Sequence, residues 1–145
     1  MRTLALIASI GVVLSSCSQP EVLNVDRAWV RLAATPKGPA AAYFVVHGGP
    51  TEDRLMSVSS PMVIRTELHE TMRGGGAMMS MRPIMGGLPV PAGSEIAFAP
   101  GGKHAMLFNV NPVIKPPRTL QLTFNFASGS RILADAVVRN AGDPE

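Results

Sequence analysis

Apolar and polar side chains alternate with a period of two over most of this 145-residue chain. In the segment 120–126, leucine or phenylalanine at every second position alternates with Gln121, Thr123 and Asn125, as in a strand with one face on the core. Short runs rich in Val, Ile, Phe and Leu predict seven strands, at 25–32, 42–47, 62–69, 95–99, 104–110, 120–126 and 132–138. No segment keeps the 3.6-residue period of an amphipathic helix.

Residues that favour turns separate these runs. Proline and glycine gather at 35–39, 48–50, 74–76, 89–93, 100–102 and 115–117. Short strands with turns at this density are typical of an all-β domain built as an antiparallel β-sandwich or barrel. The chain shows no internal repeat or linker, so we expect a single domain.

The N-terminus reads as an export signal. Arg2 is followed by an apolar stretch at 4–14 and then by Leu14-Ser15-Ser16-Cys17. The last four residues are similar to a bacterial lipobox, in which the cysteine is lipidated and becomes the first mature residue; the alternative is an ordinary signal peptide cleaved nearby. We therefore expect residues 1–16 to be removed and residues 17–145 to form a periplasmic, membrane-anchored lipoprotein.

The charge and the cysteine content argue against a nucleic-acid-binding protein and against a disulfide-stabilised one. Without Arg2 the mature chain has 12 basic and 10 acidic side chains. With no basic cluster and few aromatic residues, it offers no surface for nucleic acid. Cys17 is the only cysteine, so no internal disulfide can form.

Soft, neutral metal ligands are concentrated between residues 69 and 106. Thioether sulfur suits Cu(I), and imidazole suits either oxidation state of copper. The region holds six of the nine methionines and two of the three histidines: His69, Met72, Met78, Met79, Met81, Met85, His104 and Met106. Because His104 and Met106 are two residues apart on a predicted strand, both project from one face. The segment 73–77 can turn back as a hairpin and bring Met81 beside His69.

Other readings of these residues are less specific. Methionine often fills gaps in a core, and we expect this of Met56 and Met62. Met72, Met78, Met79 and Met85 fit an auxiliary ligand, a landing surface or a loop equally well. His47 precedes Gly48-Gly49-Pro50 without a ligand partner in sequence, so we expect a strand-end histidine there.

Several blocks of the chain resemble the periplasmic Cu(I) chaperones of the PCuAC type, which have a cupredoxin-like fold. The blocks are Ala28-Trp29-Val30-Arg31, Ala40-Ala41-Ala42-Tyr43, Asp53-Arg54-Leu55, Val58-Ser59-Ser60-Pro61, Glu67-Leu68-His69-Glu70, Met81-Arg82-Pro83, Pro91-Ala92-Gly93 and Pro100-Gly101-Gly102-Lys103-His104-Ala105-Met106. The resemblance implies one Cu(I) site with His69, Met81, His104 and Met106 as ligands.

The spacing of these residues departs slightly from the family pattern. Eleven residues separate His69 from Met81 and twenty-two separate Met81 from His104, in each case one more than is usual in the family. The extra residues fit glycines near 74–76 and 86–87. The shift leaves Met79 as an alternative to Met81, and Met72 and Met79 as candidate auxiliary ligands.

The chemistry favours transport over catalysis. The sequence shows neither a nucleophile with a base nor a carboxylate pair, so we do not expect an enzyme. A blue-copper electron carrier needs a cysteine ligand near the second histidine, and there is none. The resemblance implies delivery of Cu(I) to the binuclear copper centre of cytochrome c oxidase, on its subunit II, alone or with a thioredoxin-like partner of the Sco type. The alternatives are a copper-sequestering or resistance lipoprotein and a metal-free structural lipoprotein.

Overall fold

A computed structural model describes residues 21–74, 76 and 79–144, and this part of the chain forms ten β-strands. Each of the seven predicted runs coincides with an observed strand, so the all-β expectation is confirmed. The strands are β1 (Asn24–Arg31), β2 (Ala40–His47), β3 (Asp53–Ser59), β4 (Val63–Arg73), β5 (Met79–Pro83), β6 (Leu88–Val90), β7 (Glu95–Phe98), β8 (Lys103–Val110), β9 (Thr119–Phe126) and β10 (Arg131–Arg139).

Three strands, β3, β5 and β6, were not among the predicted runs. Every residue of β5 is exposed, so no apolar face marks it in the sequence. In β3 only Leu55 and Val58 are buried, and β6 has only three residues. The strand predicted to end at His69 continues to Arg73.

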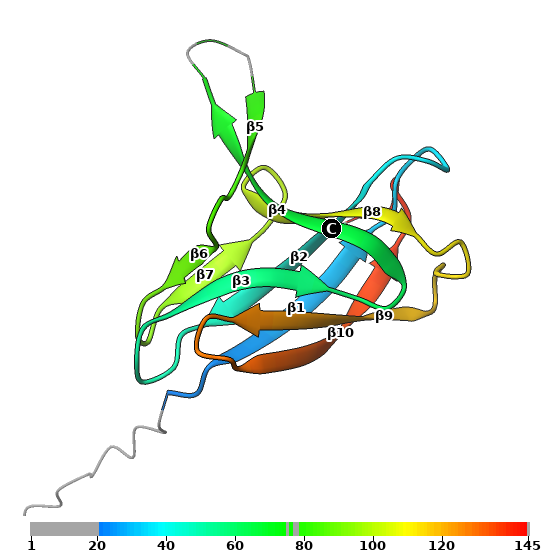
Figure 1. Cartoon of the computed structure of the whole chain (residues 1–145). Coiled ribbons are helices and arrows are strands. Elements are labelled where there is room, and N and C mark those ends of the chain that lie inside the picture. The colour runs from blue at the N-terminus through cyan, green and yellow to red at the C-terminus, as the bar shows by residue number, and fades with distance from the viewer. Residues whose placement is uncertain (1–20, 75, 77–78, 145) are drawn as a thin grey trace, which may run out of the picture.

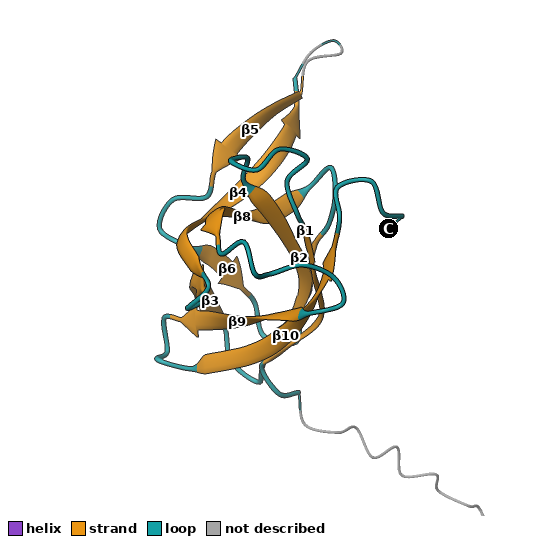
Figure 2. Cartoon of the chain, turned by 90° about the vertical axis from the view of Figure 1, so that its right-hand side faces the viewer, coloured by secondary structure: helices purple, strands orange, loops and turns teal. Residues whose placement is uncertain are grey.

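The strands form one sheet that curls upon itself (Figure 2). Their order is β5-β4-β8-β2-β1-β10-β9-β3-β6, and β7 pairs separately with β2. The curl brings β3 against β4, where the hydroxyl of Thr66 donates a hydrogen bond to the carbonyl of Val58. The result is a flattened barrel that encloses a single core.

One ladder differs from the antiparallel expectation, because β1 and β10 run parallel, with Val30 opposite Val138. Antiparallel neighbours can be joined by a short hairpin, whereas a parallel pair needs a long connection. Since β1 and β10 lie at opposite ends of the chain, the whole domain serves as that connection. The alternation of side chains does not report strand direction.

Three phenylalanines occupy the centre of the core. The rings of Phe44 and Phe98 stack with centroids 4.2 Å apart, and Phe124 meets Phe44 edge-on at 4.7 Å. Along β9 the leucines and phenylalanines are all buried, as the alternation predicted, but Thr123 on the predicted polar face is buried as well. Met62 packs against this core as expected, but Met56 is 45% exposed on β3, so the expectation of a core role for Met56 was wrong.

The hairpin of β4 and β5 projects from the body of the barrel (Figure 1). β4 pairs with β8 as far as Glu70 and with β5 from His69 to Arg73. His69 therefore lies where the two ladders overlap, at the base of the projecting arm.

The predicted signal segment 1–16, Cys17 and Met78 lie outside the described residues. In the part of the chain that the structure does describe, no helix has the length and apolar character needed to cross a membrane.

Candidate metal centre

Two histidines face each other across β4 and β8. His69 and His104 are directly opposite in the antiparallel register, and their ring centroids are 5.9 Å apart. Opposite residues in such a ladder project from the same face of the sheet. His104 is only 7% exposed, and the side chain of His69 only 13%. The ladder thus brings together two histidines that are far apart in the sequence, at a shielded position.

A thioether lies beside this pair on β8. Met106 is two residues after His104, so the two side chains share a face, as predicted from their spacing. Met106 is half-buried and lies opposite Glu67 of β4, so Met106 is diagonal to His69.

The methionines of the hairpin differ in their distance from the histidines. Met81 is opposite Thr71 and therefore diagonal to His69, on the same face. Met79 is opposite Arg73, two residues further out along the arm. Met81 and Met79 are 58% and 61% exposed. The register places Met81 as the nearer thioether and Met79 beyond it.

The register does not bring Met72 to this face. Met72 is opposite Ser80, and it lies three positions after His69, which is an odd offset along β4. Its side chain therefore projects from the other face of the hairpin. Met85 lies beyond β5 and is 82% exposed.

Hydrogen bonds distinguish the two nitrogens of each imidazole. Nε2 of His69 is 3.0 Å from a carboxylate oxygen of Glu67, and Nδ1 of His104 is 3.0 Å from the carbonyl of Gly102. Both partners can only accept, so these nitrogens donate. In the neutral rings the lone pairs then remain on Nδ1 of His69 and Nε2 of His104. Nδ1 of His69 is buried and has no hydrogen-bond partner. A buried acceptor left without a partner fits a group that a metal ion would complete.

Glu67 is the residue of this site that sequence reasoning missed. Its other carboxylate oxygen lies 3.0 Å from Nη1 of Arg65. The hydrogen bond from His69 lowers the pKa of Glu67; partial burial opposes this, and the charge of Arg65 lowers the pKa further. The spacing of Glu67 and His69, two residues apart on one strand, was the available signal. Glu70 instead pairs with Lys103 at 2.9 Å.

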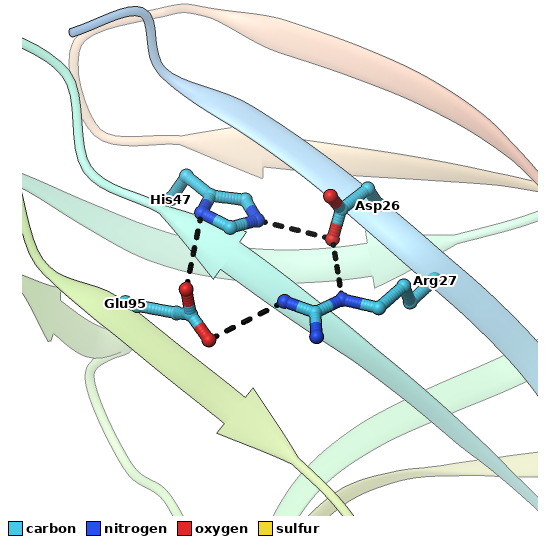
Figure 3. Close-up of polar contacts among 4 residues, drawn as sticks. All are labelled: Asp26, Arg27, His47 and Glu95. Atoms are coloured by element: carbon cyan, nitrogen blue, oxygen red, sulfur yellow. Dashed lines mark hydrogen bonds and ion pairs between the residues drawn. The ribbon is translucent and has the colours of Figure 1, made fainter.

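The third histidine is remote from this face. His47 ends β2, six residues after Ala41, which pairs with Met106; at about 3.3 Å per residue this is roughly 20 Å away. Nε2 of His47 is 3.0 Å from Asp26, and Nδ1 is 3.8 Å from Glu95 (Figure 3). The hydrogen bond from His47 lowers the pKa of Asp26. The two carboxylates flank opposite sides of the ring, so they cannot share one ion with it.

Arg27 completes this polar group by contacting both Asp26 and Glu95, each at 3.3 Å (Figure 3). The backbone of Arg27 has a φ of 52°, and the pairing of β1 with β2 shifts register between Asp26 and Trp29. A residue with positive φ at such a shift is typical of a β-bulge, which re-aims the neighbouring side chains. The group joins β1, β2 and β7 at the end of the barrel away from His69.

Among the described residues, no group of three or more His, Cys, Asp and Glu side chains could hold a metal ion. The face of β5, β4 and β8 instead combines two imidazoles with the thioethers of Met106 and Met81. These neutral donors are those that Cu(I) prefers.

Comparisons with known proteins identify the family and the fold of the chain. Residues 23–138 match the family model "Putative lipoprotein LpqE-like". The "Putative lipoprotein Lxx21020" of Leifsonia xyli subsp. xyli is 31% identical over 113 residues, covering 77% of this chain and 66% of that protein. The chain thus spans just under two thirds of the length of this curated relative.

Solved structures of PCuAC domains share the fold. The copper-bound PCuAC domain of PmoF2 superposes with a TM-score of 0.64 at 20% identity, covering 85% of this chain and 99% of that one. The solution structure of Cu(I)-bound DR1885 from Deinococcus radiodurans gives a TM-score of 0.59 at 25% identity, covering 86% and 83%. The expected resemblance to PCuAC proteins is confirmed: the chain belongs to the LpqE-like lipoprotein family and has the PCuAC fold.

Proposed function

We propose that this protein is a Cu(I) carrier that binds one ion with His69, His104, Met106 and Met81 and passes it to a copper enzyme outside the cytoplasm. The two imidazoles form the centre of the site. The thioethers of Met106 and Met81 flank them on β8 and β5.

The observation that carries this proposal is the unpartnered Nδ1 of His69. It is buried, and it belongs to a ring that stands 5.9 Å from that of His104. A buried polar atom without a partner is costly. A metal ion held between the two imidazoles removes that cost, and copper is bound in two proteins of similar fold, the PCuAC domain of PmoF2 and DR1885.

The donor set suits a carrier better than a permanent copper site. All four donors are neutral, so the bound ion keeps its positive charge and no thiolate holds it. The only cysteine is Cys17, in the signal region, so the thiolate of a blue-copper electron carrier is missing. The site can therefore bind Cu(I) and still release it.

The projecting arm supports a handover between proteins. Met81 is more than half exposed, and Met79 lies further out on the same face. An acceptor can reach Met81 first and replace one ligand at a time. The acceptor we propose is the binuclear copper site on subunit II of cytochrome c oxidase, reached directly or together with a Sco-type thioredoxin-like protein.

The location we propose is the periplasmic face of a membrane. The family is one of lipoproteins, and Cys17 in Leu14-Ser15-Ser16-Cys17 is the proposed point of lipid attachment. One acyl chain binds a membrane only marginally, whereas several chains anchor a protein stably.

The first test is a Cu(I) titration of residues 18–145 against a chromophoric Cu(I) chelator, with and without Zn(II). We expect one Cu(I) per chain, not displaced by equimolar Zn(II), because thioethers favour the softer ion. His104→Ala should weaken binding, while His47→Ala, about 20 Å away on β2, should not. Displacement by zinc, or equal effects of the two variants, would contradict the site.

The second test separates a carrier from a copper-sequestering protein. The Cu(I)-loaded domain is mixed with the apo copper-binding domain of oxidase subunit II, and copper on each protein is measured after separation. A carrier transfers its copper within minutes, and faster than copper dissociates to a chelator alone. Copper that stays on the lipoprotein would favour sequestration.

A further inference from the structure

A line of contacts runs along β4 from Arg65 through Glu67 to His69. The guanidinium carbon of Arg65 lies 4.2 Å from the centre of the Phe108 ring. Nη1 of Arg65 is 3.0 Å from Oε1 of Glu67, and Oε2 of Glu67 is 3.0 Å from Nε2 of His69. Arg65, Glu67 and His69 are at alternate positions of β4, so all three project from the same face.

This line of contacts selects which nitrogen of His69 is free. A carboxylate can only accept, so Glu67 requires a proton on Nε2, and the lone pair of the neutral ring is then on Nδ1. That nitrogen is the buried one without a partner. At His104 the carbonyl of Gly102 imposes the opposite choice, because it contacts Nδ1.

We propose that Glu67, held by Arg65, is a positioning residue that fixes the ring of His69 and makes Nδ1 its metal-binding atom. The inference rests on the proposed Cu(I) site and adds a residue to it. A carboxylate on the far nitrogen also raises the basicity of a ligating imidazole. Here the Glu67 carboxylate places one negative charge next to a site whose four donors are all neutral.

The fold does not depend on the packing of the Glu67 side chain. Its side chain is 36% exposed, and its neighbour across the ladder is Met106. Glu70 provides a matched control, because it lies on the same strand, is 42% exposed and also forms one ion pair, but with Lys103. Glu70 directly follows His69 on β4, so its side chain projects from the opposite face of the strand.

The test begins with the metal-free protein, so that it does not depend on copper binding. Long-range ¹H–¹⁵N NMR identifies the protonated nitrogen of each neutral histidine. We expect His69 to carry its proton on Nε2 and His104 on Nδ1. A neutral His69 protonated on Nδ1 would overturn the proposal.

The second measurement is Cu(I) affinity by chelator competition. Loss of an outer partner of a ligating histidine typically costs 10–100-fold in metal affinity, and we expect such a loss in Glu67→Ala. Glu67→Gln keeps one acceptor oxygen and should lose less, while Glu70→Ala should bind within twofold of the wild type. If the NMR spectrum of Glu67→Ala shows that this variant is misfolded, Arg65→Ala tests the same line of contacts. Arg65→Ala should also weaken Cu(I) binding.

Two outcomes would count against Glu67 specifically. One is a folded Glu67→Ala variant with wild-type affinity, and the other is an equal loss in Glu70→Ala. Failure of the wild-type protein to bind Cu(I) would instead refute the proposed function. The tautomer of His69 in the metal-free protein would still decide the positioning role.

Discussion

Replacing Met81 by isoleucine tests whether the register of the β4–β5 hairpin correctly identifies Met81 as a ligand. Met81 is diagonal to His69, a relation that places the two residues about 7–8 Å apart and within reach of long side chains. Met79 is two residues further along β5, which adds about 6.8 Å along the strand. From this register we predict that an ion bound to His69 is within reach of the sulfur of Met81 and out of reach of that of Met79.

The expected changes in Cu(I) affinity follow from the different distances of Met81 and Met79 from His69, and the expected changes in stability follow from the exposure of the two side chains. Loss of a direct ligand should cost at least as much as loss of an outer partner, so Met81→Ile should weaken Cu(I) binding at least tenfold, or about 1.4 kcal/mol. Met79→Ile should change affinity less than twofold. Both side chains are more than half exposed, so the free energy of unfolding should change by no more than about 0.5 kcal/mol in either variant.

The assay is anaerobic competition with a chromophoric Cu(I) chelator, accompanied by urea unfolding of each variant. The unfolding curves show whether an affinity change reflects the ligand or the fold. If Met79→Ile were the weaker binder, the hairpin register would not describe the metal-bound state, and the assignment of Met81 would be wrong.

Three further predictions concern the fold and its attachment. The ring of Phe124 is fully buried and lies edge-on to Phe44, so Phe124→Ala should lower the free energy of unfolding in urea by about 3–5 kcal/mol. Leu133 is 58% exposed, so Leu133→Ala should change it by less than about 0.5 kcal/mol. Partial burial acts to raise the pKa of Asp53, but hydrogen bonds from Ser128 and backbone amides lower it below its usual value. Its stabilisation is therefore complete above the unfolded-state pKa of about 3.9 and is lost as pH falls through the lower folded-state value. Asp53→Asn should cost about 1 kcal/mol in the free energy of unfolding at pH 7, and its difference from wild type should shrink as the pH falls below the unfolded-state value; a difference that does not change with pH would contradict this. Cys17→Ala should move the protein from the membrane fraction to the soluble fraction, and a wild-type protein found only in the soluble fraction would show that Cys17 is not lipidated.

Much of the fold could be predicted because the period of two is a local property of the sequence. The buried alternation of β9 and the turns between strands required no knowledge of the tertiary structure. β5 was missed because it has no buried face, and the parallel pairing of β1 with β10 was missed because alternation is the same in either direction.

The types of the candidate donors, and the shared face of those on one strand, follow from the sequence alone. His104 and Met106 share a face because they are two residues apart, and the lack of a cysteine near them is a matter of composition. The position of His69 opposite His104, and of Met81 nearer to His69 than Met79, could be seen only in the folded chain. These relations depend on the register between strands, which hairpin geometry and core packing set together. The burial of Nδ1 of His69 belongs with these relations, whereas the contact of Glu67 with Nε2 of His69 joins two residues of the same strand.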